Sequence, residues 1–330
     1  MKLRTKVKMP SPKVRIQYSD QICSIGSCFS VHMSDRLSHL GYPVNSNPTG
    51  ITFNPQSILR TIKIVLKPDS LQGDALLLQN GVYSHLDFHS SYSQMDAPSF
   101  IAQASNSLKV AAKSLQKAQF FIITLGTCHV HRYKKTNEIV NNCHKLPSDQ
   151  FTQELMTLNQ VIASLEETRA LVLPQTDNKP QFIFTVSPVR HIKNGLVEDR
   201  KSKSTALLAV HHMVDRFADC HYFPSYEIMT DDLRDYRYYN DDLIHPSQLA
   251  VEHIFNEFTQ SWLAPEDESL RARIEHIQKR RQHRPLFPDT EAHKDFEKKL
   301  NEDIKGLVED YPFLSQTLGL SDNHPFTRPF

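Results

Sequence analysis

Short apolar runs rich in β-branched and aromatic residues recur along the chain and alternate with segments of helical period. Two of them, FFIITLG and FIFTVS, are almost continuously apolar, which is typical of strands buried on both faces of a sheet. The predicted strands cover residues 21–25, 119–125, 181–187 and, more weakly, 220–224, with 42–45 as a possible fifth.

Segments of helical period lie between these runs. The clearest covers residues 149–171, where Phe151, Leu155 and Leu158 begin a single apolar stripe. Alternating strands and helices favour a parallel sheet covered on both faces. We therefore predict an α/β fold, a three-layer α/β/α sandwich with a mostly parallel sheet. Further helices are predicted at residues 31–40, 107–117, 202–217 and 247–262.

Two stretches depart from this alternation. Residues 74–103 indicate a hairpin or excursion between strands, with Gly81 at its turn. Residues 264–330 are charged and helical, and include a second helix near 289–309. We expect residues 1–263 to form one domain and 264–330 a helical C-terminal extension packed on it; the alternative is a separate interaction module. The apolar residues Leu270, Ile274 and Ile277 would form the contact face of this extension.

Composition narrows the function. The 330 residues include 38 Lys and Arg against 37 Asp and Glu, a net charge of +1, so neither nucleic acid nor an anionic membrane is an expected partner. No apolar run has the length of a membrane span, and the basic first residues precede no hydrophobic signal segment. The five cysteines are scattered without a CxxC motif, which favours neither disulfides nor a zinc site. We expect a cytoplasmic protein.

Histidine pairs give no metal motif. His129 and His131 alternate along one run, and His211 adjoins His212, yet no third ligand follows at a recognisable spacing. His85 and His89 are interpreted as solvated loop residues, although they could border a cleft. We therefore expect neither a metal nor a cofactor.

The candidate chemistry lies where predicted strands end, because open α/β sheets bind ligands beyond the carboxyl ends of their strands. The segments at this edge are residues 26–30 after the first strand, 126–129 after the second and 187–191 after the third. The segment DDLIHPS (241–247) precedes the last core helix.

Asp242 and His245 have the spacing of a carboxylate that orients a general base. The carboxylate can accept the Nδ1–H bond and so leave Nε2 free to take a proton. The alternative is a helix cap with an incidental histidine.

Ser27 and Cys28 are candidate nucleophiles, since a helix N-terminus favours a developing anion. The alternatives are a helix cap for Ser27 and a small buried side chain for Cys28. Arg190 could bind a carboxylate or phosphate of the substrate; the alternative is a salt bridge. Its partner would then be Asp231, Asp232 or Asp235.

Five segments, in order along the chain, resemble the GSCFA family, a group related to the SGNH/GDSL hydrolases. The resemblance covers residues from about 3 to about 310, and its most specific part is the tract that ends in HPS. The segments are GSCFS (26–30), NPTGITFNP (47–55), TLGT (124–127), TVSPVRHIKNG (185–195) and YFPSYEIMTDDLRDYRYYNDDLIHPS (222–247).

The resemblance implies a flavodoxin-like, SGNH-type sheet and an esterase-like site. The turn Gly-Asp-Ser of the GDSL pattern, with serine as nucleophile, corresponds here to Gly26-Ser27-Cys28, which places Cys28 at the nucleophile position and Ser27 in place of Asp. The terminal Asp-x-x-His falls unaltered on Asp242 and His245. An N–H donor to the oxyanion is implied near Gly50.

The GxND block of that superfamily matches at Gly126, followed by Thr127, with Cys128 where an oxyanion-hole Asn would stand. One polar donor is therefore replaced. The Thr127 hydroxyl or the backbone N–H of Cys28 could serve the oxyanion instead.

Two hypotheses follow. The first is a hydrolase or acyltransferase that acts on a small acyl ester through a covalent acyl-enzyme, with Cys28 or Ser27 as nucleophile, His245 as base and Asp242 orienting it. In it we expect a depressed Cys28 pKa and fast alkylation. The alternative is a non-catalytic binding module that keeps the cleft but has lost the oxyanion machinery. The acyl donor, the acceptor and the oligomeric state are not indicated by the sequence.

Overall fold

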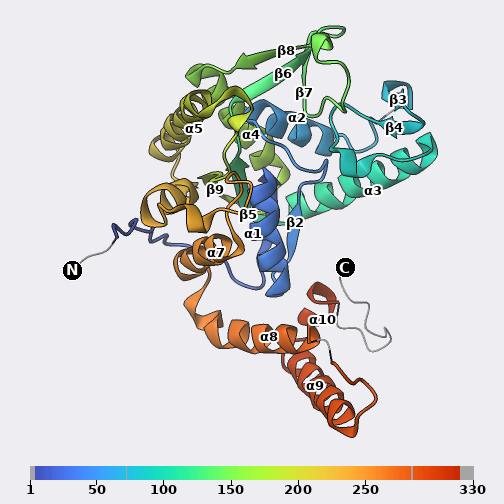
Figure 1. Ribbon diagram of the computed structural model, residues 1–330, viewed down its shortest axis with the longest axis vertical. Coiled ribbons are helices and arrows are strands. Elements are labelled where there is room, and N and C mark those ends of the chain that lie inside the picture. The colour runs from blue at the N-terminus through green and yellow to red at the C-terminus, as the bar shows by residue number, and fades with distance from the viewer. Residues whose placement is uncertain (1–3, 72, 284, 320–330) are drawn as a thin grey trace.

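A five-stranded parallel sheet forms the centre of the protein (Figure 1). The computed structural model describes residues 4–71, 73–283 and 285–319. Taken in chain order, the strands of this sheet lie 2-1-3-4-5, the flavodoxin-like arrangement. The parallel sheet predicted from the apolar runs is confirmed. Its strands are β2 (Val44–Ser46), β1 (Gln21–Gly26), β5 (Ala118–Leu125), β9 (Gln181–Val186) and β10 (Cys220–Tyr222).

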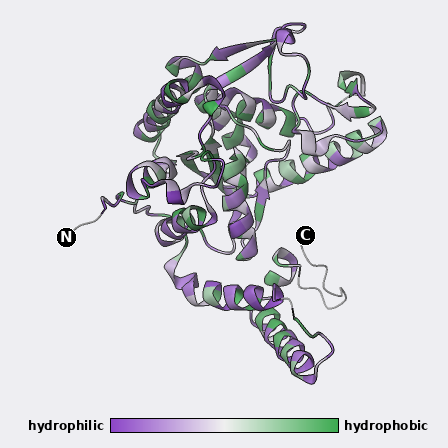
Figure 2. Ribbon diagram, in the orientation of Figure 1, coloured by the Kyte–Doolittle hydropathy of each residue, from purple (hydrophilic) through white to green (hydrophobic). Residues whose placement is uncertain are grey.

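Helices cover both faces of the sheet and complete the three-layer sandwich. Neighbouring residues of a strand point to opposite faces, so Phe120 and Ile122 of β5 join one core cluster and Phe121 and Ile123 the other. Hydrophobic residues concentrate in this interior (Figure 2). One face carries α1 (Cys28–His39) and α7 (Gln248–Trp262), and the other α2 (Pro55–Val65), α3 (Ala97–Gln116), α4 (Leu158–Val172) and α5 (Leu196–Arg216).

A small antiparallel sheet corrects one predicted helix. Residues 149–157 are not α-helical: after a 3-10 turn at Ser148–Gln150, Phe151–Leu155 form β8 and pair with β6. The helix α4 begins only at Leu158, after a capping box of Thr157 and Gln160. The apolar spacing of Phe151, Leu155 and Leu158 imitates a helix, and pairing with β6 overrides it. The sheet comprises β7 (Glu138–Val140), β6 (His129–Tyr133) and β8 (Phe151–Leu155).

The segment between β2 and β5 contains a hairpin and two helices. The hairpin turns at Asn80 and Gly81, both with positive φ, as a two-residue turn requires. The helix predicted at 107–117 begins already at Ala97, and α2 was not predicted although Asn54 and Pro55 are a helix-start signal. The strands of the hairpin are β3 (Leu77–Gln79) and β4 (Val82–Ser84).

The C-terminal helices contact the end of α1. Leu270, Ile274 and Ile277 are buried in the same core cluster as α1 and α7, while the helix after α8 runs away from the sheet (Figure 1). Gln278 donates a hydrogen bond to the His39 carbonyl at 3.2 Å. Of the predicted extension, residues 284 and 320–330 lie outside the described residues. The helices are α8 (Glu268–Arg281), α9 (Glu291–Asp310) and α10 (Leu314–Thr317).

The connection from β10 to α7 contains the short helix α6 (Ser225–Glu227), followed by one π-helical turn (Ile228–Asp232). Across the described ranges, no helix is long and apolar enough to cross a membrane.

Gly26 fixes the turn from β1 into α1. Its φ is +148°, and a Cβ there would lie 2.2 Å from the Thr124 carbonyl oxygen. The Gly26 N–H donates to Asn47 Oδ1 at 2.8 Å, and the Gly26 carbonyl accepts from the Thr52 N–H at 3.0 Å. Hydrogen bonds on both sides therefore hold the turn against β5 and the loop after β2.

Gly26→Ala should lower the free energy of unfolding by about 3 kcal/mol, because the new methyl group collides with backbone and the φ angle is unfavourable. Urea unfolding measures this change. Gly73→Ala is the matched control, since nothing lies within 4 Å of its Cβ position, and it should change stability by less than about 0.5 kcal/mol. Equal effects of the two substitutions would contradict the packing argument.

Limited proteolysis should yield no stable, folded fragment that begins near residue 264. The apolar face of α8 is buried in the core cluster of the sandwich, and the segment alone is too polar to supply a core. Mass spectrometry of a trypsin time course identifies the fragments. A protected fragment from about residue 264 onward would show instead that the extension folds independently.

Candidate active site

The candidate site lies at the topological switch point of the sheet, between β1 and β5, where open α/β sheets bind ligands. Ser27 and Cys28 follow β1, and Gly126 follows β5. A Cβ on Gly126 would lie 3.1 Å from the Ser27 Cβ and 3.4 Å from Nε2 of His191 in the loop after β9. Three strand ends thus converge on one point.

Ser27 and Cys28 differ in access to solvent. Ser27 is 1% exposed, and its hydroxyl oxygen is buried without a hydrogen-bond partner among the described residues. It occupies the N-cap position of α1, yet its side chain makes no capping bond, contrary to the cap interpretation. Cys28 is only partly buried. The thiol is therefore the more accessible of the two candidate nucleophiles.

Burial favours the protonated form of the Cys28 thiol. Burial raises its pKa above the ordinary value, while the N–H groups of Phe29 and Cys28 and the charge of Lys203 act in the opposite direction. The expectation of a depressed Cys28 pKa is therefore wrong, because burial outweighs the helix N-terminus. A base that takes the thiol proton would therefore assist its reaction.

Asp242 and His245 form the hydrogen-bonded pair that their spacing predicts. Oδ2 of Asp242 lies 2.6 Å from Nδ1 of His245, and Oδ1 accepts from the backbone N–H of His245 at 3.0 Å and of Ile244 at 2.9 Å. These bonds, led by the His245 N–H, lower the pKa of Asp242 to about 2. The carboxylate is thus charged and orients the ring, leaving Nε2 free.

Burial lowers the pKa of two other histidines, His32 and His191, near the candidate site. The pKa of His32 is lowered mainly by burial and also by His245. The pKa of His191 is likewise lowered by burial first and by His245 among others. His32 stands one turn after Cys28 on α1, and the Arg190 N–H, next to His191, donates to the Ile244 carbonyl at 3.3 Å, so the loop that carries His245 contacts the loop after β9.

Arg190 contacts the loop that carries the Asp242–His245 pair. Its guanidinium donates to the Leu243 carbonyl at 3.1 Å, and its backbone N–H donates to the Ile244 carbonyl at 3.3 Å. The guanidinium carbon also lies 4.0 Å from the ring centre of Tyr239. Leu243 has a φ of +56°, a strained angle for this residue, which the two bonds help to hold.

The alternative interpretation of Arg190, a salt bridge to Asp231, Asp232 or Asp235, is not found among the described residues. Asp232 contacts Arg4 and His253, and Asp235 bonds to Arg237. Asp231 accepts a hydrogen bond from the Thr230 hydroxyl, so each of the three aspartates has another partner. The Arg190 guanidinium binds the Leu243 carbonyl instead.

The groups predicted to bind an oxyanion are already hydrogen-bonded within the protein. The Gly50 N–H donates to the Asn47 carbonyl at 2.7 Å, and the N–H groups of Gly126 and Thr127 donate to the Phe53 carbonyl at 2.9 and 2.8 Å. The Thr127 hydroxyl lies 2.9 Å from that of Ser202. These bonds shape the loops around the site, and each would have to be shared or broken to stabilise an oxyanion.

Lys203 is a buried cation that the sequence reasoning missed. Its Nζ donates to the carbonyl oxygens of Gly126 at 2.6 Å and Ser187 at 2.7 Å, and so ties the ends of β5 and β9 together. The residue is 1% exposed. Burial lowers its pKa to about 8, and the charge of Asp199 is the largest contribution that raises this pKa. A signal existed: Lys203 lies on the apolar stripe of α5 with Ala206.

Asn47 is a second residue that the sequence reasoning missed. Its Oδ1 accepts from the Gly26 N–H, and its Nδ2 donates to the Ser30 hydroxyl at 3.0 Å. One amide thus clamps the turn before Cys28 to the first turn of α1. Its left-handed φ of +45° could not be read from the sequence NSNPTG.

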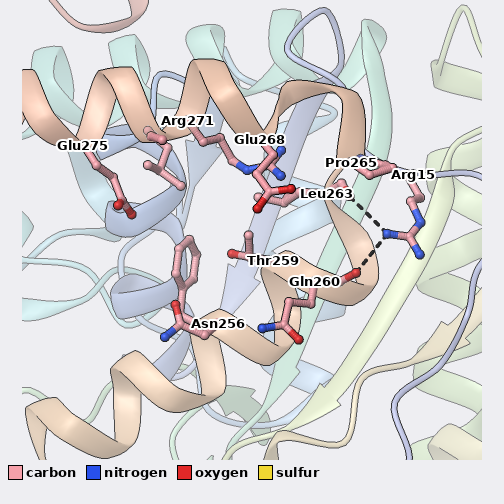
Figure 3. A pocket seen from close by; sticks show the side chains of 12 residues that line it. Arg15, Asn256, Thr259, Gln260, Leu263, Pro265, Glu268, Arg271 and Glu275 are labelled. Atoms are coloured by element: carbon pink, nitrogen blue, oxygen red, sulfur yellow. Dashed lines mark hydrogen bonds between the residues drawn. The ribbon is translucent and has the colours of Figure 1, made fainter.

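In the part of the chain that the structure describes, neither a metal-ligand cluster nor the crevice between α7 and α8 involves Cys28 or His245. No group of three potential ligands that could hold a metal occurs within residues 4–71, 73–283 and 285–319. A crevice of about 400 Å³ lies between α7 and α8 and is lined by Thr259, Glu268 and Arg271 among others (Figure 3). It contains neither Cys28 nor His245, so the candidate site is a separate region.

Comparison with known proteins identifies the family. A model described as GSCFA family matches residues 21–258, and one described as GSCFA domain protein, C-terminal domain, matches residues 274–317. No curated protein matches the chain. The first match spans more than half of the chain and includes both the Cys28 turn and the Asp242–His245 pair. The chain belongs to the GSCFA family.

Proposed function

We propose that this protein is a cysteine-dependent acyl-ester hydrolase or acyltransferase, related to the SGNH/GDSL hydrolases. The observation that carries the proposal is the Asp242–His245 hydrogen bond, on a loop at the sheet edge where Cys28 begins α1. A histidine oriented by a carboxylate, near a partly exposed thiol, is the arrangement of nucleophilic acyl transfer. The expected substrate is a small molecule with an acyl ester, and we infer a cytoplasmic location from the charge balance and the free thiols.

The first half of the reaction forms a thioester. Nε2 of His245 takes the proton of the Cys28 thiol as the sulfur adds to the ester carbonyl carbon, and the carbonyl π pair moves to oxygen. The tetrahedral intermediate collapses when its C–O bond to the alcohol breaks, and the alcohol leaves with the proton from His245. The charge of Asp242 stabilises the imidazolium between these steps.

The second half releases the acyl group. Water in a hydrolase, or an acceptor alcohol or amine in a transferase, loses a proton to His245 as it adds to the thioester carbonyl. The C–S bond then breaks, and the Cys28 thiolate recovers the proton. Because the pKa of this thiol is raised in the resting protein, His245 is needed in both halves.

Exposure supports Cys28 over Ser27 as the nucleophile. The Ser27 oxygen is buried beneath the turn, whereas the thiol is partly exposed and faces the N–H groups of the first turn of α1. Ser27 instead packs against Gly126. A substrate carbonyl reaches the sulfur with less rearrangement.

A non-catalytic binding module is the second candidate. The observation that favours it is the internal hydrogen bonding of Gly50, Gly126 and Thr127, which leaves their donors engaged. Such a protein would keep the cleft and bind an ester without forming an adduct. A wild-type protein that takes no acyl group onto Cys28 from an activated ester would favour this candidate.

Treatment with p-nitrophenyl acetate should place one acetyl group on Cys28, detected by peptide mass spectrometry. Cys28→Ala should abolish the adduct, and Ser27→Ala should change its rate by less than about 10-fold, because the thiol supplies the reacting atom. Buried Cys23, whose pKa burial raises to about 12, is the internal control and should stay unlabelled. Acetylation that survives Cys28→Ala but not Ser27→Ala would transfer the role to the serine.

Iodoacetamide labelling of Cys28 should accelerate with rising pH through a midpoint above about 8.5, the ordinary thiol value, because burial raises its pKa. At pH 7, His245→Ala should slow labelling about 10-fold or more, since the base is lost. Slow labelling at pH 7 that His245→Ala leaves unchanged would count against base assistance.

Arg190→Ala should lower the rate of Cys28 acetylation about 10-fold, because the loop that carries His245 loses its anchor. On a His245→Ala background the same substitution should have almost no effect, since the two residues act through one element. The matched control is Arg237→Ala, an exposed arginine that pairs with Asp235. Additive effects in the double variant would show that Arg190 acts on the substrate instead.

A further inference from the structure

The proposed reaction places a negative charge on the carbonyl oxygen of the tetrahedral intermediate, and catalysis requires donors aimed at that oxygen. The N–H groups at the first turn of α1 face the thiol and can supply one side. The residue at the position of the oxyanion-hole Asn is Cys128, which is fully buried and donates its N–H to the Ser202 hydroxyl at 2.7 Å. A donor on the other side must come from elsewhere.

His191 is the polar side chain that the fold directs to this place. Its Nε2 lies 3.4 Å from the Cβ position of Gly126, the same point that is 3.1 Å from the Ser27 Cβ. The backbone N–H of His191 donates to Asp199 Oδ1 at 3.0 Å, and the His191 ring packs edge-on against Phe53 with 5.6 Å between ring centres. The backbone of His191 is therefore held by Asp199 and its ring by Phe53, beside the turn that presents Cys28.

The ring nitrogens of His191 have no hydrogen-bond partner within the part of the chain that the structure describes. Partly buried polar atoms of this kind normally find a partner in the protein, in water or in a ligand. At the edge of a candidate active site, the substrate can supply that partner.

We propose that His191 donates its Nε2–H to the oxyanion formed when Cys28 attacks the acyl carbonyl. This inference rests on the proposed function, since it concerns a step of that reaction. It makes His191 a catalytic residue that contacts the reacting oxygen and takes the place of the missing asparagine amide. The neutral ring carries one N–H, and this role assigns that proton to Nε2.

The charge state of His191 suits a donor. Its pKa is lowered to about 4, mainly by burial and further by Lys203, His129 and His245. The charge of Asp199 raises the pKa but does not outweigh these effects. The ring is then neutral throughout the pH range in which the thiol reacts. A neutral imidazole that polarises a carbonyl through its N–H is an established catalytic device.

The same environment makes His191 unsuitable as the base. A ring with a pKa near 4 holds a proton poorly, and no carboxylate contacts its side chain through a hydrogen bond within the described ranges. His245 has Asp242 at 2.6 Å to stabilise its protonated form. The two histidines thus divide the work, His245 transferring protons and His191 donating a hydrogen bond.

Two reactions of the same thiol separate these roles. Acetylation of Cys28 by p-nitrophenyl acetate passes through a tetrahedral oxyanion, whereas alkylation by iodoacetamide displaces iodide at a CH₂ carbon and forms none. His191→Leu should slow acetylation about 100- to 1,000-fold and change alkylation less than about 2-fold. His191→Gln places an amide N–H near the position of Nε2 and should recover at least 10-fold of the acetylation rate.

The controls keep the result decisive. Unchanged alkylation and thermal unfolding of His191→Leu would show that the site is folded, so that slow acetylation reports the lost donor. Equal slowing of both reactions would show that His191 acts on the thiol, and no slowing of acetylation would show that it has no catalytic part; either result overturns the inference. Acetylation at an unchanged rate in Cys28→Ala would overturn the proposed function itself.

Discussion

Gly26 and Thr124 approach each other so closely that no side chain fits between them, and the position of Cys28 follows from this contact. The turn after β1 must pass directly against the backbone of β5. This is the topological switch point, where the strand order of the parallel sheet reverses. Asn47 then binds the turn from the other side. The first residue of α1 is thereby fixed before any catalytic group is considered, and the loops after β5 and β9 are arranged around it.

Lys203 is the internal counterpart of that contact. A buried ammonium group is costly unless oxygen atoms surround it, and the two carbonyls it contacts end neighbouring strands. Its positive charge lies beneath Gly126 and acts on the thiol of Cys28, opposing the effect of burial on that pKa. Lys203 therefore holds the ends of β5 and β9 together and also lowers the pKa of the nearby Cys28 thiol.

Local pattern was sufficient for the sheet, because neighbouring residues such as Ile122 and Ile123, which face opposite sides of β5, are both apolar, as in a strand buried on both faces. It was sufficient for the Asp242–His245 bond, which a spacing of three residues can form within one loop. It failed for Phe151–Leu155, whose strand exists only through pairing with β6. It also failed for Lys203 and Arg190, because their partners are backbone carbonyls brought near by the fold, and a sequence does not show which carbonyls those are.

The helix α1 has a second consequence. It begins at Cys28, and after 12 residues, about 18 Å along its axis, it ends where Gln278 of α8 binds the His39 carbonyl. The first family match ends within α7 and the second begins within α8, so α1, which lies in the first region, contacts the second region at its last residue. Cys28 and His39, the residue that α8 contacts, thus lie at the two ends of the same helix. A change in how α8 packs on the end of α1 would therefore act on Cys28 through the position of that helix.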